Sequence, residues 1–290
     1  MCLDTWMSWN GTWVQDSKIK KFLFLFKRFK KNNKFRMKKE KPQKISVVTV
    51  TQWKRFSVLK LVASCLFRQS KRADEWIIVD GNSNPEDAAL LSAQMDTLRD
   101  EAMVSIVYVP YQYPTPLGEL RNRGNMACKG DIIICFDDDD YYPPTRIQHV
   151  IEEFKAHPDK LIAGCSKLLI QDYTTLQFYQ CNGFNDNHST NSAMAWKKLY
   201  LKNHSYDNTK KNGEEAGFTN NFTEPMIQLD PLHTVVLSAH CQNTFDKKEL
   251  LNDSRIYTPL PFKLMPTLMD AMMYRKYFAI FREMEKEMNP

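Results

Sequence analysis

Four consecutive aspartates occupy residues 137–140, between the apolar run IIICF and the segment YYPP. Two unit charges about 4 Å apart repel by about 1 kcal/mol in water and by about 4 kcal/mol at an effective dielectric constant of 20. Four carboxylates at the end of a buried segment therefore favour a cation beside them. Oxygen ligands of this kind suit Mg²⁺ or Mn²⁺, which usually keep water molecules and substrate phosphates as further ligands.

A divalent cation at this acidic turn predicts a class of substrate. The ion can bridge to a diphosphate and neutralise the charge that develops as the diphosphate departs. A solvated acidic turn is the alternative, but the apolar run before it and the prolines after it argue against that interpretation. The sequence therefore suggests a substrate that contains a nucleoside diphosphate.

The elements that must position these carboxylates follow from the hydrophobic pattern. Short apolar runs predict strands at residues 45–51, 75–80, 104–110 and 131–136, with helical periodicity between them. Strands and helices that alternate in this way predict an α/β fold with a mostly parallel sheet flanked by helices. Ligands of such sheets bind beyond the carboxyl ends of the strands. The polar residues at these ends are Thr49, Thr51, Asp80 and the four aspartates.

The second half has a different, mixed pattern. Helices are expected at residues 145–158, 192–203 and 214–222, and strands at 161–171, 174–181 and 234–240. The expected domains are a flexible basic leader at 1–43, a main domain at 44–262 and a C-terminal amphipathic helix at 263–290. Within the main domain, residues 44–144 form the nucleotide-binding half and residues 145–262 the acceptor half.

The turn after the first strand excludes two common nucleotide-binding classes. Residues 51–57 read TQWKRFS and contain no glycine. A dinucleotide-binding fold needs G-x-G-x-x-G at this turn, and a P-loop needs GK[ST]. Binding of NAD and hydrolysis of ATP by a P-loop are therefore not expected. The remaining possibility is a nucleotide that is held by threonine side chains, an aspartate and a metal.

The net charge of +6 is unevenly distributed. Residues 1–44 carry 13 Lys and Arg against three acidic residues, so the remaining 246 residues are net acidic. A peripheral contact between residues 18–44 and an anionic membrane is the sharper alternative to a merely flexible arm. No RNA- or DNA-binding motif occurs, so nucleic acid is not an expected partner. Seven cysteines without a CxxC pair, and no recognisable secretion signal, favour a cytoplasmic location.

Three segments resemble motifs of family 2 glycosyltransferases with the GT-A fold. ISVVTVTQWKR is similar to xSVIIPTYNR, EWIIVDGNS to xIIVDDGS, and LRNRGNMACKGDIIICFDDDDYYPP to xRNxGxxxAxGxYIxFLDxDDxxxP. The three occur in the family's order over about 100 residues. DDDDYYPP, with the later HSTN and GEEAGF, looks most like glycosyltransferases of large DNA viruses and microbes. A viral origin would imply the host cytoplasm as the location.

The resemblance implies roles for the acidic turn. Asp139 falls at the metal-binding aspartate, the last acid of the family's DxD motif. Asp137 and Asp138 fall where the family contacts the ribose and the metal, so Asp137 is a second candidate metal ligand. Many GT-A enzymes also place a metal-binding histidine about 25 residues after the catalytic base, which is the position of His240 in this chain. His233 is a weaker candidate.

Nucleotide contacts carry over to the strand ends and to one helix. Thr49 and Thr51 match the nucleotide-contacting end of the first strand, Asp80 matches the first acid of VDDGS, and Arg121 matches the arginine near the phosphates. Arg55 is a further candidate in the turn after the first strand.

Two of the motifs depart from the family pattern, and the second departure affects the nucleotide base. The usual Tyr-Asn of the first motif is Gln52-Trp53, and the second acid of VDDGS is Gly81. That acid reads uracil in some members. Its absence leaves the nucleotide base open, with a UDP-sugar as the preferred donor and a GDP-sugar as the alternative.

The acceptor half must supply a base, because displacement at the anomeric carbon needs a group that takes the acceptor's proton. GEEAGF resembles the family's ED motif, which implies Glu215 as the base and Glu214 as the second candidate. An acidic pair stabilised by a helix N-terminus is the alternative. HSTN at residues 188–191 is a candidate lining of the acceptor or phosphate site.

The predicted function is that of a metal-dependent inverting glycosyltransferase, which moves a sugar from a nucleotide sugar to a hydroxyl of a glycan, glycoprotein or glycolipid. Mn²⁺ or Mg²⁺ is the expected cofactor. A sugar-phosphate nucleotidyltransferase is the rival enzyme, although its usual glycine-rich loop is missing. A nucleotide- or carbohydrate-binding protein without catalysis is the third alternative.

Overall fold

The structure is a computed structural model that describes residues 42–243, 251 and 253–288. Nearly all of the predicted leader at residues 1–43, and most of the proposed membrane-contacting segment 18–44, lie outside the described residues. Among the helices of the described part, none is long and apolar enough to cross a membrane.

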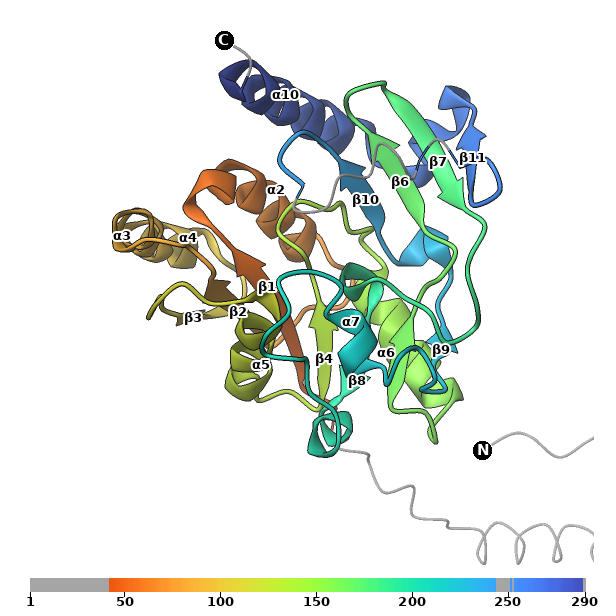
Figure 1. Ribbon diagram of the computed structural model, residues 1–290, viewed down its shortest axis with the longest axis horizontal. Helices are drawn as coiled ribbons and strands as arrows, with labels where there is room; N and C mark the ends of the chain where they lie inside the picture. Colours follow the sequence, from red (N-terminus) through yellow and green to blue (C-terminus); the bar gives the residue numbers. More distant parts are fainter. Residues whose placement is uncertain (1–41, 244–250, 252, 289–290) are drawn as a thin grey trace, which may run out of the picture. The chain divides into compact units, whose positions relative to one another are not determined.

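A seven-stranded mixed sheet forms the centre of the fold (Figure 1). Its strands, in spatial order, are β3 (Ser105–Val109), β2 (Glu75–Asp80), β1 (Ile45–Thr51), β4 (Ile132–Cys135), β8 (Ala195–Lys197), β5 (Ile162–Gly164) and β9 (Ile227–Gln228). The first four strands are parallel, and β8 pairs antiparallel with both β4 and β5. The predicted α/β fold with a mostly parallel sheet is confirmed.

A second sheet of four strands comes from the acceptor half. Its strands, in spatial order, are β10 (Val236–Ala239), β6 (Leu169–Asp172), β7 (Gln177–Cys181) and β11 (Tyr257–Leu260). The expected antiparallel pairing of the two strands in the region 161–181 is found between β6 and β7.

The described helices cover the sheets and connect the strands. They are α2 (Phe56–Phe67), α3 (Pro85–Ala93), α4 (Met95–Glu101), α5 (Leu117–Ala127), α6 (Arg146–Ala156), α7 (Glu215–Phe218), α9 (Met265–Leu268) and α10 (Ala271–Met288). Short 3-10 turns are η1 (Trp53–Arg55), η2 (Asn191–Ala193), η3 (Lys198–Lys202), η4 (Pro231–His233) and η5 (Phe262–Leu264). In Figure 1, α10 lies beside α2 and the small sheet.

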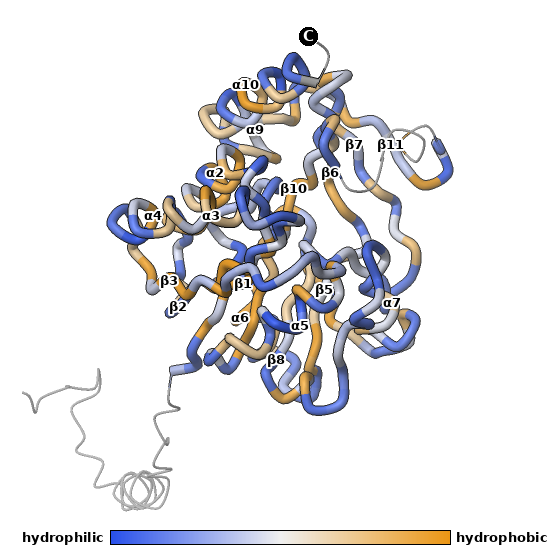
Figure 2. The backbone as a smooth tube through the Cα atoms, turned by 60° about the vertical axis from the view of Figure 1, so that its left-hand side comes forward, coloured by the Kyte–Doolittle hydropathy of each residue, from blue (hydrophilic) through white to orange (hydrophobic). Residues whose placement is uncertain are grey.

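The central strands are buried on both faces, as parallel sheets between helices usually are. Side chains of β4 alternate between two apolar clusters, with Ile132 and Ile134 in one and Ile133 in the other. Figure 2 shows the same contrast, because the central strands are largely orange and most connecting loops are blue. This rigid sheet fixes the strand ends that carry the predicted site residues.

Two segments differ from the sequence-based expectation. The helix expected at 192–203 is replaced by β8 and η3, because the fully buried Trp196 pairs with both β4 and β5. The single helix expected near the C-terminus is divided into α9 and α10. Asp270 interrupts it, and its carboxylate accepts a hydrogen bond from the N–H of Met273.

Candidate functional site

The strand order places a crevice where ligands of such sheets bind. After β1 the chain adds β2 and β3 on one side, and then returns to place β4 on the other side of β1. Crevices form at this kind of reversal, outside the carboxyl ends of the strands. A cleft of about 1280 Å³ lies there, lined by Thr51 after β1, by the acidic turn after β4 and by Glu215 of α7.

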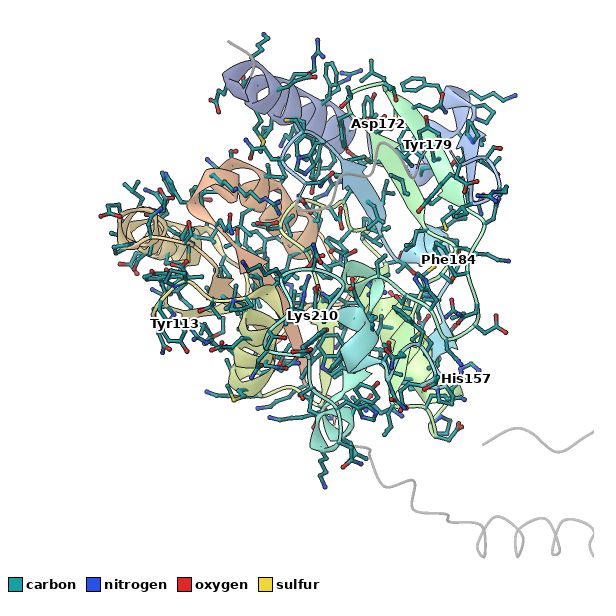
Figure 3. The ribbon with its side chains drawn as sticks, in the orientation of Figure 1. Tyr113, His157, Asp172, Tyr179, Phe184 and Lys210 are labelled. Atoms are coloured by element: carbon teal, nitrogen blue, oxygen red, sulfur yellow. The ribbon has the colours of Figure 1, made fainter. Side chains whose placement is uncertain are left out.

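One wall of the cleft is formed by the segment before α7. Lys211, Asn212 and Gly213 line the cleft, and their neighbour Lys210, labelled in Figure 3, accepts a hydrogen bond from the N–H of Gly118 at 3.0 Å. A Cβ atom at residue 118 would lie 2.0 Å from the backbone oxygen of Asp207. Glycine at the start of α5 is therefore needed for this segment to approach.

The first two aspartates of the turn bind cationic and hydroxyl groups of the chain itself. Asp137 Oδ1 lies 3.0 Å from Arg121 Nη1. Asp138 accepts hydrogen bonds from Thr51 Oγ1 at 2.8 Å and from Arg55 Nη1 at 3.0 Å. Burial and the neighbouring Asp139 raise the pKa of Asp138 to about 6, while Arg55 opposes this rise.

The last two aspartates connect the turn to β10 and to the loop after it. Asp139 Oδ2 lies 3.1 Å from His240 Nε2 and 3.3 Å from Arg55 Nη1. Asp140 accepts a hydrogen bond from the N–H of Ser238 at 2.8 Å. Each of the four carboxylates therefore has a specific partner, which explains how four like charges are accommodated at the end of a buried strand.

Tyrosines fix the conformation of this turn. The N–H of Asp137 donates to Tyr142 Oη, whose ring stacks on Phe136 at 3.8 Å. Tyr277 of α10 donates to the backbone oxygen of Asp140. Neither tyrosine is a predicted site residue, although Tyr142 belongs to the YYPP segment that follows the aspartates.

Arg121 joins the two halves of the site in a buried ion-pair network. Its Nε donates to Glu214 Oε1 at 2.5 Å, and its Nη1 contacts Asp137. Burial alone would lower the pKa of Arg121, but the two carboxylates raise it well above its usual value. Glu214 is itself 3 % exposed, so its carboxylate serves this network. The two glutamates of GEEAGF therefore have different environments.

Asn191 extends this network. From the sequence it was a candidate only as the last residue of the HSTN segment. Its side-chain amide lies between Arg121 and the hydroxyl of Tyr206, with the oxygen accepting from the guanidinium at 2.5 Å. The N–H of Asn191 donates to Glu215 Oε1 at 3.2 Å. His188 and Thr190 also line the cleft.

Glu215 lies in an environment that makes its carboxylate more basic than usual. It is half-buried at the first position of α7 and lines the cleft. Burial, followed by the adjacent charge of Glu214, raises its pKa to about 7. A carboxylate with this pKa is about half ionised at neutral pH, and its ionised form accepts a proton readily.

The raised pKa of Glu215 predicts a pH profile. Below pH 7 the carboxylate becomes protonated and can no longer accept the acceptor's proton, so kcat/KM should rise with pH and level off above about pH 8. Below about pH 6 we expect a tenfold loss for each unit. Steady-state rates at several pH values test this, and the residual activity of Glu215→Gln should lack this limb. A wild-type profile that is flat between pH 5 and 8 would contradict the assignment.

Two predicted nucleotide contacts, Thr49 and Asp80, are not among the residues that line the cleft. Thr49 is fully buried and accepts a hydrogen bond from Trp76 Nε1. Asp80 accepts hydrogen bonds from Tyr108 and from Asn82. It thereby shapes the turn after β2, and Asn82 of this turn lines the cleft. The strand ends were located correctly, but these two side chains support the site from behind.

Only a few of the predicted metal ligands lie close enough together to bind one divalent ion. No cluster of three or more His, Cys, Asp or Glu side chains is arranged to hold an ion within the described part of the chain. The predicted ligands Asp139 and His240 do lie together, whereas Asp137 is paired with Arg121 and His233 contacts Thr145. Two protein ligands beside a diphosphate fit Mg²⁺ or Mn²⁺, which often use one or two carboxylates plus phosphates and water.

The family model described as glycosyl transferase family 2 matches residues 46–211. The match spans more than half of the chain and includes the strand ends, Arg121 and the acidic turn. The chain belongs to glycosyl transferase family 2.

Solved structures support the fold. The crystal structure of S. aureus TarS 1–349 is 14% identical and has a TM-score of 0.51, covering 68% of this chain and 60% of that one. The same protein in complex with UDP-GlcNAc is 15% identical with a TM-score of 0.53, covering 69% and 60%. At these identities the likeness shows the GT-A fold. No curated protein matches.

Proposed function

We propose that this family 2 member transfers a sugar from a nucleoside diphosphate sugar to an acceptor hydroxyl, with inversion at the anomeric carbon. The observation that carries the proposal is that Glu215, with its raised pKa, faces the same cleft as the acidic turn and the end of β1. Because the similar TarS structures include complexes with UDP-GlcNAc and UDP, a UDP-sugar is the first donor to test.

The donor would lie across the carboxyl ends of β1, β2 and β4. Thr51 and Arg121 would contact the ribose and the phosphates, which is supported by the fact that both line the cleft. A Cβ atom at Gly81 would lie 3.0 Å from Leu120 and 3.1 Å from Val50. A side chain at this position would be crowded, so the base is contacted by backbone and by neighbouring polar groups such as Ser83.

The chemical step would be a direct displacement. The acceptor oxygen forms a bond to the anomeric carbon while the bond from that carbon to the diphosphate oxygen breaks. The acceptor's proton passes to Glu215, and the nucleoside diphosphate leaves with the bonding electron pair. Asn191 holds the Glu215 carboxylate through its N–H, and Arg121 places positive charge between the two halves of the cleft.

Asp139 and His240 would hold Mn²⁺ or Mg²⁺. When bound, such an ion supplies positive charge that stabilises the departing diphosphate. Arg55 already contacts Asp138 and Asp139, so the chain itself provides part of the charge compensation at this turn.

The proposal is tested by the release of nucleoside diphosphate from a panel of UDP- and GDP-sugars, with and without Mn²⁺. For Asp139→Ala we expect a loss of at least about 100-fold in kcat/KM, which corresponds to roughly 3 kcal/mol of transition-state stabilisation. Asp159→Ala is the matched control, because Asp159 is exposed and lies outside the cleft.

Three results would speak against the proposal. Turnover that survives Asp139→Ala unchanged would remove the acidic turn from catalysis. Pyrophosphate as the product would indicate a nucleotidyltransferase instead. Metal-dependent nucleotide binding without turnover on any acceptor would indicate a binding protein.

A further inference from the structure

Three aromatic side chains lie in consecutive contact beside the cleft, with each pair of rings tilted by 35° to 47°. Phe184, on the loop after β7, lies 4.4 Å from His188 between ring centroids, and His188 lies 4.8 Å from Phe222. We call these three residues the aromatic ladder. His188 lines the cleft, and Phe184, which is labelled in Figure 3, is 53% exposed.

The backbone that carries Phe222 is held in an unusual conformation. Asn220, Asn221 and Phe222 have φ angles of 49°, 55° and 59°. Asparagine tolerates this left-handed region, but a bulky residue such as phenylalanine rarely adopts it. Strained residues of this kind cluster at ligand-binding and active sites, where the surrounding structure enforces them. The strained turn therefore suggests that the position of the Phe222 ring is important for function.

Hydrogen bonds connect the strained turn to the helix of the proposed base. The N–H of Asn221 donates to the backbone oxygen of Ala216 at 2.6 Å, one residue after Glu215. The N–H of Phe222 donates to Thr219 Oγ1 at 3.2 Å. The position of the ring is thus fixed relative to Glu215.

The segment that carries His188 reaches the same carboxylate. Gln228 Nε2 donates to the backbone oxygens of Asp186 and His188, which holds the loop. Three residues later, the N–H of Asn191 donates to Glu215. The His188 segment is therefore anchored at Glu215, which would remove the acceptor's proton, and the Phe222 segment is anchored at the next residue, Ala216.

Polar groups around the ladder are mostly neutral. Side-chain amides on the two segments belong to Asn185, Asn187, Asn220 and Asn221, with Asp186 as a carboxylate. His188 Nδ1 and Thr190 Oγ1 are buried without a hydrogen-bond partner among the described residues. Buried polar atoms are usually paired, so unmet ones point to a ligand or water that completes the wall. Burial also lowers the pKa of His188, which leaves its ring uncharged at neutral pH.

We propose that the aromatic ladder of Phe184, His188 and Phe222 is the acceptor subsite and that its ligand is a pyranose ring. A pyranose has an apolar face of C–H bonds that stacks on aromatic rings, and a rim of hydroxyl groups that neutral amides can hydrogen-bond. The acceptor would therefore be a glycan. This inference rests on the proposed function, because it assigns the ladder to the hydroxyl-bearing substrate of Glu215.

Saturation-transfer NMR tests the subsite directly. The probes are methyl β-D-glucopyranoside, methyl β-D-galactopyranoside and methyl α-D-mannopyranoside, added to the full chain. At least one probe should receive saturation at its ring C–H protons. Phe184→Ala and Phe222→Asn should each reduce that signal at least fivefold. Phe262→Ala should leave it unchanged, because Phe262 is 54% exposed, like Phe184, but belongs to η5, outside the ladder.

The variant Phe222→Asn separates binding from folding. Asparagine accepts the left-handed backbone more readily than phenylalanine, so the melting temperature should be unchanged or higher while the ring is lost.

The outcomes distinguish this inference from the proposed function. If no methyl glycoside receives saturation, or if all four proteins give equal signals, the ladder is not a pyranose site. If glycoside binding behaves as expected but no sugar nucleotide is turned over, the proposed function fails and the subsite stands.

Discussion

Glu215→Gln should reduce kcat by about 10³-fold and leave donor affinity nearly unchanged. General base catalysis by a positioned side chain typically contributes 10²- to 10⁴-fold. The amide has almost the same shape as the carboxylate, so it can still accept the hydrogen bond from the N–H of Asn191. It cannot take a proton from the acceptor hydroxyl. Initial rates at saturating donor and acceptor, together with calorimetric binding of UDP, measure the two quantities separately.

Glu224→Gln is the matched control for this variant. Glu224 is a half-buried glutamate shortly after α7, contacts His204 at 2.9 Å and does not line the cleft. Its kcat should remain within a factor of about three of the wild-type value, since surface ion pairs contribute little. Equal losses in Glu215→Gln and Glu224→Gln would indicate a structural effect on α7 and would remove Glu215 from the chemical step.

Arg121→Met should lower the free energy of unfolding by about 3–5 kcal/mol. Removing one partner of a buried ion pair leaves an uncompensated buried charge, and losses of this size are typical. Here Glu214 is buried and Asp137 is largely so, and both contact the same guanidinium. Urea denaturation of the wild type and the variant measures the difference.

Two further variants identify the cause of the Arg121→Met effect. Arg123→Met should cost less than about 1 kcal/mol, because Arg123 lies on the same helix but pairs with the partly exposed Glu119 instead of a buried carboxylate. Adding Glu214→Gln to Arg121→Met should recover part of the lost stability, because it removes one of the stranded charges. If Glu214→Gln destabilised the Arg121→Met variant as much as it destabilises the wild type, the two residues would be independent, and this result would argue against the network.

Much of the fold was predictable because periodicity and strand-end composition are local properties. The runs at 45–51, 75–80 and 131–136 correspond closely to β1, β2 and β4. Parallel strands align their carboxyl ends, so the approach of Thr51 to the acidic turn also followed from the pattern, and the two are joined by a hydrogen bond from Thr51 to Asp138. The helix predicted at residues 192–203 was wrong, because the pairing of β8 with both β4 and β5 outweighed the helix-like pattern of this segment.

The sequence by itself determined the element order and the edge of the sheet at which the polar residues meet. It also determined that one half contains a run of four aspartates and the other half a pair of glutamates. Only the tertiary structure decided which carboxylate has which partner. Arg121 pairs with Glu214, 93 residues away, whereas Glu215 accepts a hydrogen bond from the N–H of Asn191, and both glutamates line the cleft. Thr49 and Asp80 turn to buried partners instead. The physical reason is that strand and helix patterns depend on neighbouring residues, whereas charge pairing depends on which distant side chains the packed sheet brings within 3 to 4 Å.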